Sequence, residues 1–365
     1  MILTAARDTA DSLTTKAPPV GQETDTIMKT ASRFSPKISP RRVVVAVAAT
    51  GALALTAALT IAHSASASAN TAGGYRFSTL DNAGDATFNQ LLGINNEGVI
   101  AGYLGSGAKG HPNKGYQLFA PYGQGNYQGE NVPSSRQTQV TGLNDVGVTV
   151  GFWSNQNKAS MVNANFGFYF VGGQYHTVSF PTTNNASPQV DQLLGVNDHD
   201  VAVGFYTNAQ GNNRGYTYNI NTPTFTRVLV PGAPGGKAGP SLTAAAINNN
   251  GDVAGFFAKT SSQTDAFLLL RNGTFVTLAV PGATMTQAFG VNDRDEVVGA
   301  YTIGSGASAV THGFTWRPGY GFTTVNDPHG RSATTINGVN DAGDLVGFYA
   351  DSAGNTDGFL ATPRG

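Results

Sequence analysis

The chain has 365 residues, a formal net charge of −1 and no cysteine, and only 12% of its residues are charged. The lack of cysteine excludes disulfides, thiol chemistry and Cys-ligated zinc, and the charge balance excludes a basic nucleic-acid surface. The length suits one large all-β domain behind a leader, with a core large enough to be stable without disulfides.

The first 69 residues have the features of an export leader. Residues 1–42 are polar and are predicted to be disordered, and Met28 would be a more ordinary start than the first residue. An apolar run from Val43 to Ala62 follows two arginines, and alternating Ser and Ala come after it. Residues 43–69 are therefore predicted to form a secretory signal peptide with its cleavage region. The run is also long enough to span a bilayer, so a retained N-terminal anchor is the alternative.

One motif then recurs six times. Its last copy, Gly338 to Tyr349, consists of an apolar strand, a polar Asn-Asp-Ala-Gly turn and a second apolar strand. Asn and Asp initiate turns by bonding to their own backbone, and Gly supplies the positive φ that closes a hairpin. Two copies have Asp200 and Asp295 in place of this Gly, and Asp is one of the few other residues that tolerate positive φ. The shared Asn stands at positions 95, 144, 197, 248, 292 and 340.

The spacing of the copies predicts the architecture. Successive Asn residues lie 44 (292 − 248) to 53 (197 − 144) residues apart, which is typical of propeller blades. Each period contains four strand-like segments, named A to D here, bounded by Gly, Pro and Asn. The domain, residues 70–365, begins with a lone D-type strand, Tyr75–Leu80, and ends with a C-type strand, Gly358–Ala361. We therefore predict a six-bladed β-propeller of four-stranded blades, closed by the N-terminal strand completing the last blade.

Glycines and small residues suggest how the blades pack. Strand A is expected to be innermost, so that the small residue before each turn, such as Gly93, lies where the strands crowd around the axis. The Gly within each strand B, such as Gly102, is expected to allow tight packing between blades. In the first blade, strand D must lie within Gly123–Pro133, which is poorly apolar, so a short or distorted strand is expected there.

The repeat, with its Gly-Phe and Phe-Thr-Thr-Val segments, resembles the bacterial extracellular repeat proteins of the HAF type. The His-Ala-Phe segment that names the family corresponds here to His312-Gly313-Phe314, Asp265-Ala266-Phe267 and Asp357-Gly358-Phe359, so the His is mostly absent. The resemblance covers nearly all of residues 75–363. It implies secretion and a propeller-like fold, and it implies no particular reaction.

No catalytic, metal or cofactor signature stands out, and we predict none of these. Turns such as Asn340 to Asp344 loosely resemble calcium loops, but calcium takes about six to eight oxygens, and turn chemistry already explains the residues. Asp81, Asp85, Asp191 and Asp327 lie near D–A connections, where a propeller pocket has its rim. A paired-carboxylate hydrolase would need two of these acids to face one cleft.

Aromatic residues end strand B in most copies. The position after the strand-B Gly is mostly Phe and is interpreted as core between blades. The next position faces the opposite side of the strand and carries Trp153, Tyr206, Tyr301 and Tyr349. These four combine an apolar body with a polar tip, so they are candidate ligand-binding residues for a sugar or a peptide. Packing beneath the B–C loops is the alternative.

The preferred function is that of an exported, monomeric, non-catalytic binding or adhesion module. Its partner would be an extracellular polysaccharide or protein, with no nucleic acid and no membrane insertion after signal cleavage. The ligand face would carry the B–C and D–A loops, because function usually lies on loops. The alternatives are an extracellular hydrolase or lyase using acids on that face, and a structural protein of the cell envelope. Two carboxylates converging with a His or Arg in the axial channel would favour the enzyme, whereas Gly, Ala and backbone there would oppose it.

Overall fold

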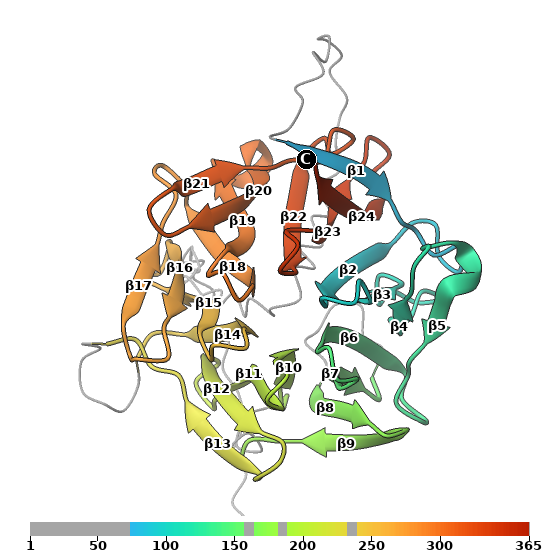
Figure 1. Cartoon of the computed structure of the whole chain (residues 1–365), viewed down its shortest axis with the longest axis horizontal. Coiled ribbons are helices and arrows are strands. Elements are labelled where there is room, and N and C mark those ends of the chain that lie inside the picture. The colour runs from blue at the N-terminus through green and yellow to red at the C-terminus, as the bar shows by residue number, and fades with distance from the viewer. Residues whose placement is uncertain (1–73, 157–163, 182–187, 232–238, 365) are drawn as a thin grey trace, which may run out of the picture. The chain divides into compact units, whose positions relative to one another are not determined.

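The regular secondary structure of the described residues is almost entirely β-strand, and the strands are arranged around a common centre (Figure 1). The structure, a computed structural model, describes residues 74–156, 164–181, 188–231 and 239–364. The expected disordered leader (1–42) and signal segment (43–69) lie outside the described residues. Within these ranges, no helix is both long and apolar enough to cross a membrane.

Three sheets have four antiparallel strands each, in sequence order. These strands are the predicted A, B, C and D segments, so the repeated four-stranded organisation is confirmed. The first group consists of β2 (Asn89–Ile94), β3 (Ile100–Leu104), β4 (Lys114–Leu118) and β5 (Tyr127–Gly129). The second consists of β6 (Gln137–Leu143), β7 (Thr149–Ser154), β8 (Phe166–Val171) and β9 (Gln174–Val178). The third consists of β10 (Asp191–Val196), β11 (Val201–Thr207), β12 (Asn213–Asn219) and β13 (Thr224–Arg227).

The remaining strands form one twelve-stranded sheet, which contains three further antiparallel groups of four. Neighbouring groups within it are joined by single parallel pairs, Thr264 with Met285 and Thr311 with Ala333. The fourth group consists of β14 (Leu242–Ile247), β15 (Val253–Ala258), β16 (Thr264–Leu269) and β17 (Phe275–Leu278). The fifth consists of β18 (Met285–Val291), β19 (Val297–Ile303), β20 (Val310–Arg317) and β21 (Gly321–Thr324). The last consists of β22 (Ala333–Val339), β23 (Leu345–Ala350), β24 (Thr356–Pro363) and β1 (Tyr75–Thr79).

The N-terminal strand β1 lies antiparallel to β24, as expected from the sequence (Figure 1). The register runs from Tyr75 opposite Pro363 to Thr79 opposite Phe359. The rings of Phe77 and Phe359 lie 5.5 Å apart, so side chains as well as backbone hold β1 in place. The first described strand therefore provides the outer edge of the last group.

The outer strand of the first group is short, as expected. β5 has three residues and directly follows a 3-10 turn, η1 (Gln124–Asn126). Its residues are half-buried or exposed, because this segment offers few apolar side chains to cover the strand beside it.

The hairpin turns have the predicted conformation. Asp200 and Asp295 adopt φ values of 55° and 57°, so these two copies tolerate the left-handed region without Gly. In the first turn the N–H of Gly98 donates to the carbonyl of Asn95 at 3.1 Å. The glycines at this position have φ between 77° and 90° at residues 98, 147, 251 and 343.

The inner strands β2, β6, β10, β14, β18 and β22 contact one another in succession, and β22 contacts β2. A Cβ atom at Gly142 would lie 2.9 Å from the Cα of Gly195, and one at Gly338 would lie 3.1 Å from the Cα of Gly93. The small residue before each turn therefore allows the inner strands to approach, as predicted.

The glycines of the second strands do not pack between groups, so that expectation is wrong. A Cβ atom at Gly204 would overlap the carbonyl oxygen of Gln192, which belongs to the neighbouring strand of the same sheet. The register of β10 and β11 shifts between Leu193 and Gly195, which marks a β-bulge. The bulge brings the carbonyl of β10 toward β11, and every group has a register shift at this place. Gly is needed there because of the bulge.

Substitution of Gly204 by Ala should lower the free energy of unfolding by about 1–3 kcal/mol or more, because the new methyl group overlaps backbone that cannot move independently. Gly125→Ala is the matched control, because a Cβ atom there has nothing within 4 Å. Urea denaturation of the two variants measures the difference. Equal stability of both would contradict the bulge explanation.

Candidate functional site

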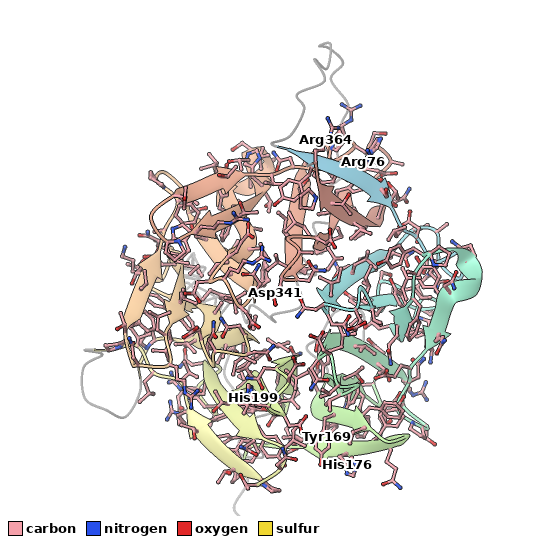
Figure 2. The ribbon with its side chains drawn as sticks, viewed as in Figure 1. Arg76, Tyr169, His176, His199, Asp341 and Arg364 are labelled. Atoms are coloured by element: carbon pink, nitrogen blue, oxygen red, sulfur yellow. The ribbon has the colours of Figure 1, made fainter. Side chains whose placement is uncertain are left out.

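The six Asn turns surround a recess on the central axis, called the turn recess here. It holds about 80 Å³ of space, and Figure 2 shows Asp341 near its centre. Apolar residues such as Ile94 and Val339 form its floor. Its polar lining consists of Asn95, Asn96, Asn144, Asp145, Asn197, Asp198, Asn248, Asn249, Asn292, Asp293, Asn340 and Asp341.

The first Asn of each turn forms one belt of hydrogen bonds around this recess. In the third group the side-chain oxygen of Asn197 accepts the N–H of Val201 at 3.0 Å, which closes its own turn. Its amide nitrogen donates to the carbonyl of Asn248 in the next group at 2.9 Å. The same bond joins every group to the next, including Asn340 of the last group to Asn95 of the first, at distances of 2.9–3.4 Å.

The next residue of each turn forms a second belt. Its backbone N–H donates to the side-chain oxygen of the equivalent residue in the following group, as from Asp293 to Asp341 at 2.9 Å. The belt runs from Asn96 through all groups and returns when Asp341 donates to Asn96 at 2.8 Å. Four of the six acceptors are carboxylates, and hydrogen bonds to ionised acceptors are stronger than bonds between neutral groups.

The turn interpretation of the motif is therefore correct but incomplete. The same Asn and Asp side chains that shape each turn also link neighbouring groups. The sequence contains a signal for this link. In all six copies the first position is Asn and the second is Asn or Asp, whereas a turn alone would also accept Ser or Gly. Within the described ranges, no group of three or more His, Asp or Glu side chains is placed to hold a metal ion.

A second recess, lined by residues of the inner strands, lies on the same axis and also holds about 80 Å³. It is lined largely by Gly, Ala and branched apolar residues, with Thr141 and Asn337 as polar side chains. Both of these bond to neighbouring strands, Thr141 to the carbonyl of Leu193 and Asn337 to that of Leu91. Ligand pockets usually have about 300–1,000 Å³, so neither recess encloses a small molecule. Neither recess has a His or Arg among its described lining residues, so neither shows carboxylates converging with a His or Arg.

The four predicted aromatic residues occupy two different environments. Tyr206 is 6% exposed and stacks on Phe180 at 4.3 Å, and Tyr349 is 4% exposed. The other two are half-buried: Trp153 lies 4.9 Å from the ring of Phe166, and the Tyr301 hydroxyl bonds to a threonine at 2.8 Å. Burial favours the packing interpretation for the first pair and leaves Trp153 and Tyr301 as the accessible members.

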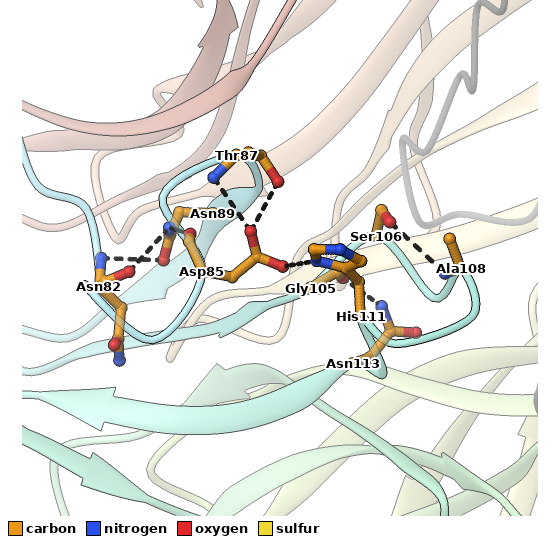
Figure 3. Close-up of polar contacts among 9 residues, drawn as sticks. All are labelled: Asn82, Asp85, Thr87, Asn89, Gly105, Ser106, Ala108, His111 and Asn113. Carbon is orange, nitrogen blue, oxygen red and sulfur yellow. Dashed lines mark hydrogen bonds and ion pairs between the residues drawn. The ribbon is translucent and has the colours of Figure 1, made fainter.

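Two of the four predicted acids contact a histidine. One is Asp85, in the loop before β2 (Figure 3). The carboxylate lies 2.6 Å from Nδ1 of His111, in the loop after β3, and accepts both the N–H and the hydroxyl of Thr87. Burial acts to raise the pKa of Asp85, but these hydrogen bonds outweigh it and hold that pKa below its ordinary value. The contact ties a D–A loop to a B–C loop.

The second acid, Asp327, is 2% exposed and lies 3.1 Å from Nδ1 of His329, whose side chain is 67% exposed. Burial raises the pKa of Asp327, and one of its oxygens has no hydrogen-bond partner among the described residues. Its backbone N–H donates to Thr334, and the residues that make the equivalent bond in two other groups are Val132 and Val280. The other oxygen accepts the backbone N–H of His329 at 2.8 Å, so this carboxyl group also shapes its own loop.

Two of the predicted acids come together around Tyr349. The His329 ring lies 5.9 Å from that of Tyr349, and the charges of Asp81, Asp327 and Asp357 all act on its hydroxyl. The sequence did not single out Asp357 as a site residue, because its place in β24 is that of an ordinary strand position. Its pKa is raised by burial and by neighbouring carboxylates.

The remaining acid, Asp191, has a structural role. It accepts the N–H of Phe180 at 2.6 Å and the hydroxyl of Tyr216 at 2.5 Å, and it is fully buried. Burial raises its pKa to about 7, which the two hydrogen bonds only partly offset. Thr138 and Thr286 hold the equivalent loops in other groups, so Asp191 fastens a loop.

No protein-family model matches this sequence. A search of curated proteins gives no match either.

Several solved structures resemble the fold at low identity. AofleA from Arthrobotrys oligospora has a TM-score of 0.48 at 9% identity, covering 78% of this chain and 85% of that one. A PL25 ulvan lyase, solved with bound saccharide, has a TM-score of 0.39 at 14% identity, covering 74% and 78%. The six-bladed fucose-recognising lectin of Aleuria aurantia has a TM-score of 0.39 at 11% identity, covering 64% and 77%. At these scores the resemblances carry no argument about this chain.

Replacement of Asp341 tests the second belt. Asp341→Ala removes the acceptor for the N–H of Asp293 and should lower the free energy of unfolding by about 1 kcal/mol. Asp341→Asn keeps an acceptor oxygen and should stay within about 0.5 kcal/mol of the parent, because Asn96 and Asn249 already fill this place. Thermal or urea unfolding of the pair provides the measurement. An Asn variant as unstable as the Ala variant would show that charge, rather than the hydrogen bond, is what matters.

Proposed function

We propose that the six groups are the blades of a closed β-propeller, sealed by β1, and that the chain belongs with the HAF-type repeat proteins. Support for closure comes from the pairing of β1 with β24 and from both belts, whose bonds run from the last group to the first. Apolar packing crosses the same junction, since Val346 and Leu360 cluster with Leu91 and Ile100. The repeat spacing and motif support the family assignment.

The propeller, residues 70–365, is proposed to be exported and to act as a monomer. The basis is the leader sequence, with its polar segment, apolar run and small-residue cleavage region. Freedom from cysteine is compatible with an extracellular site, because a core of this size is stable without disulfides.

On this scaffold the function is proposed to be non-catalytic binding or adhesion, with an extracellular polysaccharide or protein as the partner. One observation carries the proposal: the belts use the repeated polar groups of the turns for bonds between blades. The side chains that differ between groups, among them those of the Asp85–His111 contact, lie in the B–C and D–A loops. Trp153 and Tyr301 are the half-buried aromatics beneath those loops and are proposed to stack on the ligand, with Tyr206 and Tyr349 supporting that surface.

A hydrolase or lyase is the second candidate, favoured by the acids around Tyr349. Burial raises the pKa of Asp81 to about 6 and also raises that of Asp357, and a carboxyl group that keeps its proton closer to neutral pH can act as a general acid. Against it, His329 and His111 belong to separate contacts. A structural role in the cell envelope is the third candidate and predicts neither binding of a small saccharide nor turnover.

Binding is tested with the exported protein on an array of neutral, amino and acidic glycans. The parent protein should bind at least one class, and Trp153→Ala or Tyr301→Ala should weaken that binding by up to about tenfold, since loss of an aromatic contact costs about 0.5–1.5 kcal/mol. Tyr320→Ala is the control, because Tyr320 is 89% exposed at the turn between β20 and β21. Clean negatives across the array would exclude the carbohydrate form of the proposal.

The enzyme candidate is tested by incubating the same polysaccharides with the protein and measuring new chain ends. The binding proposal expects none above a buffer control. Chain ends that appear with the parent and disappear with Asp357→Asn, while folding is unchanged, would overturn the non-catalytic assignment in favour of the hydrolase or lyase.

A further inference from the structure

Asp81 lies at the junction between the last group and the first. It follows β1 and Leu80, and the backbone N–H of Leu80 donates to the carbonyl of Gly358 at 2.8 Å. One oxygen of Asp81 accepts the N–H of the same Gly358 at 2.9 Å. On the other side, Gln124 of the first group donates to the Asp81 carbonyl at 2.6 Å. The residue therefore contacts both sides of the junction.

Two other groups have asparagine at this position. The side-chain oxygen of Asn131 accepts the N–H of Gly115 at 3.2 Å, and its amide donates to the carbonyl of that Gly at 3.1 Å. Asn326 likewise accepts the N–H of Gly313 at 3.2 Å, and its amide nitrogen lies 3.0 Å from Nδ1 of His312. Asn therefore uses both an acceptor and a donor here. An ionised carboxylate has no hydrogen to donate, whereas a protonated carboxyl group has one.

The surroundings of Asp81 favour the protonated form. Asp357, on β24, and Asp351, in the loop before β24, are the charged groups that act on it from the last group. From the first group, Tyr116 and Tyr127 are close enough for the charge of Asp81 to raise their pKa values, and within the described part of the chain their buried hydroxyls have no hydrogen-bond partner. Tyr349 on β23 is the remaining titratable neighbour. Burial and the neighbouring carboxylates of Asp357 and Asp351 therefore destabilise the ionised form of Asp81.

We propose that Asp81 is a proton-operated latch on the pairing of β1 with β24, which completes the last group. With its proton, the side chain holds Gly358 by an acceptor and a donor, as Asn131 holds Gly115. Without it, the donor is lost and a negative charge is added beside Asp357 and Asp351. The end of β1 is thus held to β24 more firmly under acidic conditions than under neutral or alkaline conditions.

The direction of the pKa shift agrees with the geometry. Burial raises the pKa of Asp81 to about 6 from 3.8, with Asp357 and Asp351 adding to the effect and the Gly358 hydrogen bond opposing it. Because the folded-state pKa is above the unfolded value, the folded state binds the proton more tightly. Stability therefore falls as the pH rises from about 4 to about 6, and the loss is complete above that range.

The test compares Asp81→Asn with the parent chain across pH 5 to 8, by thermal unfolding and by amide exchange at Leu80 and Gly358. The Asn variant keeps a donor at every pH, so at pH 8 its midpoint should be higher than that of the parent. Exchange at these two amides should be slower by about tenfold to a hundredfold at pH 8, since the pKa of Asp81 is raised from 3.8 to about 6 and each unit is a factor of ten, and the difference should shrink toward pH 5. Part of the pH dependence of the parent will remain, because Asp191, Asp327 and Asp357 also have raised pKa values.

Asn131→Asp is the reciprocal variant and introduces the same carboxyl group in the first group. It should lose stability at pH 8 relative to pH 5, and protection should fall at Gly115 and not at Gly358. The latch is overturned if Asp81→Asn is less stable than the parent at pH 8, or if the difference between the two does not change with pH. A pH-dependent loss of global stability in the parent, with no local change in amide exchange at Gly358, would also exclude this latch.

Discussion

The structure depends on hydrogen bonds that join each inner turn to the next around the axis. A single Asn performs two tasks: its oxygen closes its own turn, and its amide nitrogen binds the carbonyl of the following group. Local conformation and the orientation of neighbouring sheets are thus fixed by the same side chain. One such bond contributes only about 1 kcal/mol, but the bonds around the axis share their end points, so each supports the geometry of the next. The bulged inner strands and their glycines allow this close approach.

Most of the fold could be predicted from the sequence because its signals are local. Turn residues with positive φ, including Asp200 and Asp295, follow from backbone sterics, and the strand order follows from the repeat. The partner of β1 could be predicted because one strand was in excess at one end of the domain and one was missing at the other. The bulge beside Gly204 could not, because a register shift leaves no trace in the alternation of side chains. The partners of the Asn amides could not either, because they lie in another copy of the repeat.

The candidate site was less predictable for a geometric reason. Side chains on one strand alternate between the two faces of its sheet. Here neighbouring groups cover both faces of each four-stranded group, so this alternation does not separate core from surface. Phe205 and Tyr206 are consequently both buried, although they point to opposite sides. The sequence placed Asp81 and Asp327 near D–A connections, and their meeting with Asp357 at Tyr349 depends on a group built from both ends of the domain.

The pairing of β1 with β24 has a consequence for how the domain is made. Asp81 and Gly358 are 277 residues apart in sequence, so β1, the first strand of the described residues, has no partner until almost all of the domain has been made. Its unpaired edge is meanwhile a template for pairing with other chains. Closing so long a loop costs little more entropy than closing a shorter one, so the delay is a matter of synthesis order rather than of stability. Synthesis of β24 therefore determines when β1 gains its partner and is protected from pairing with other chains.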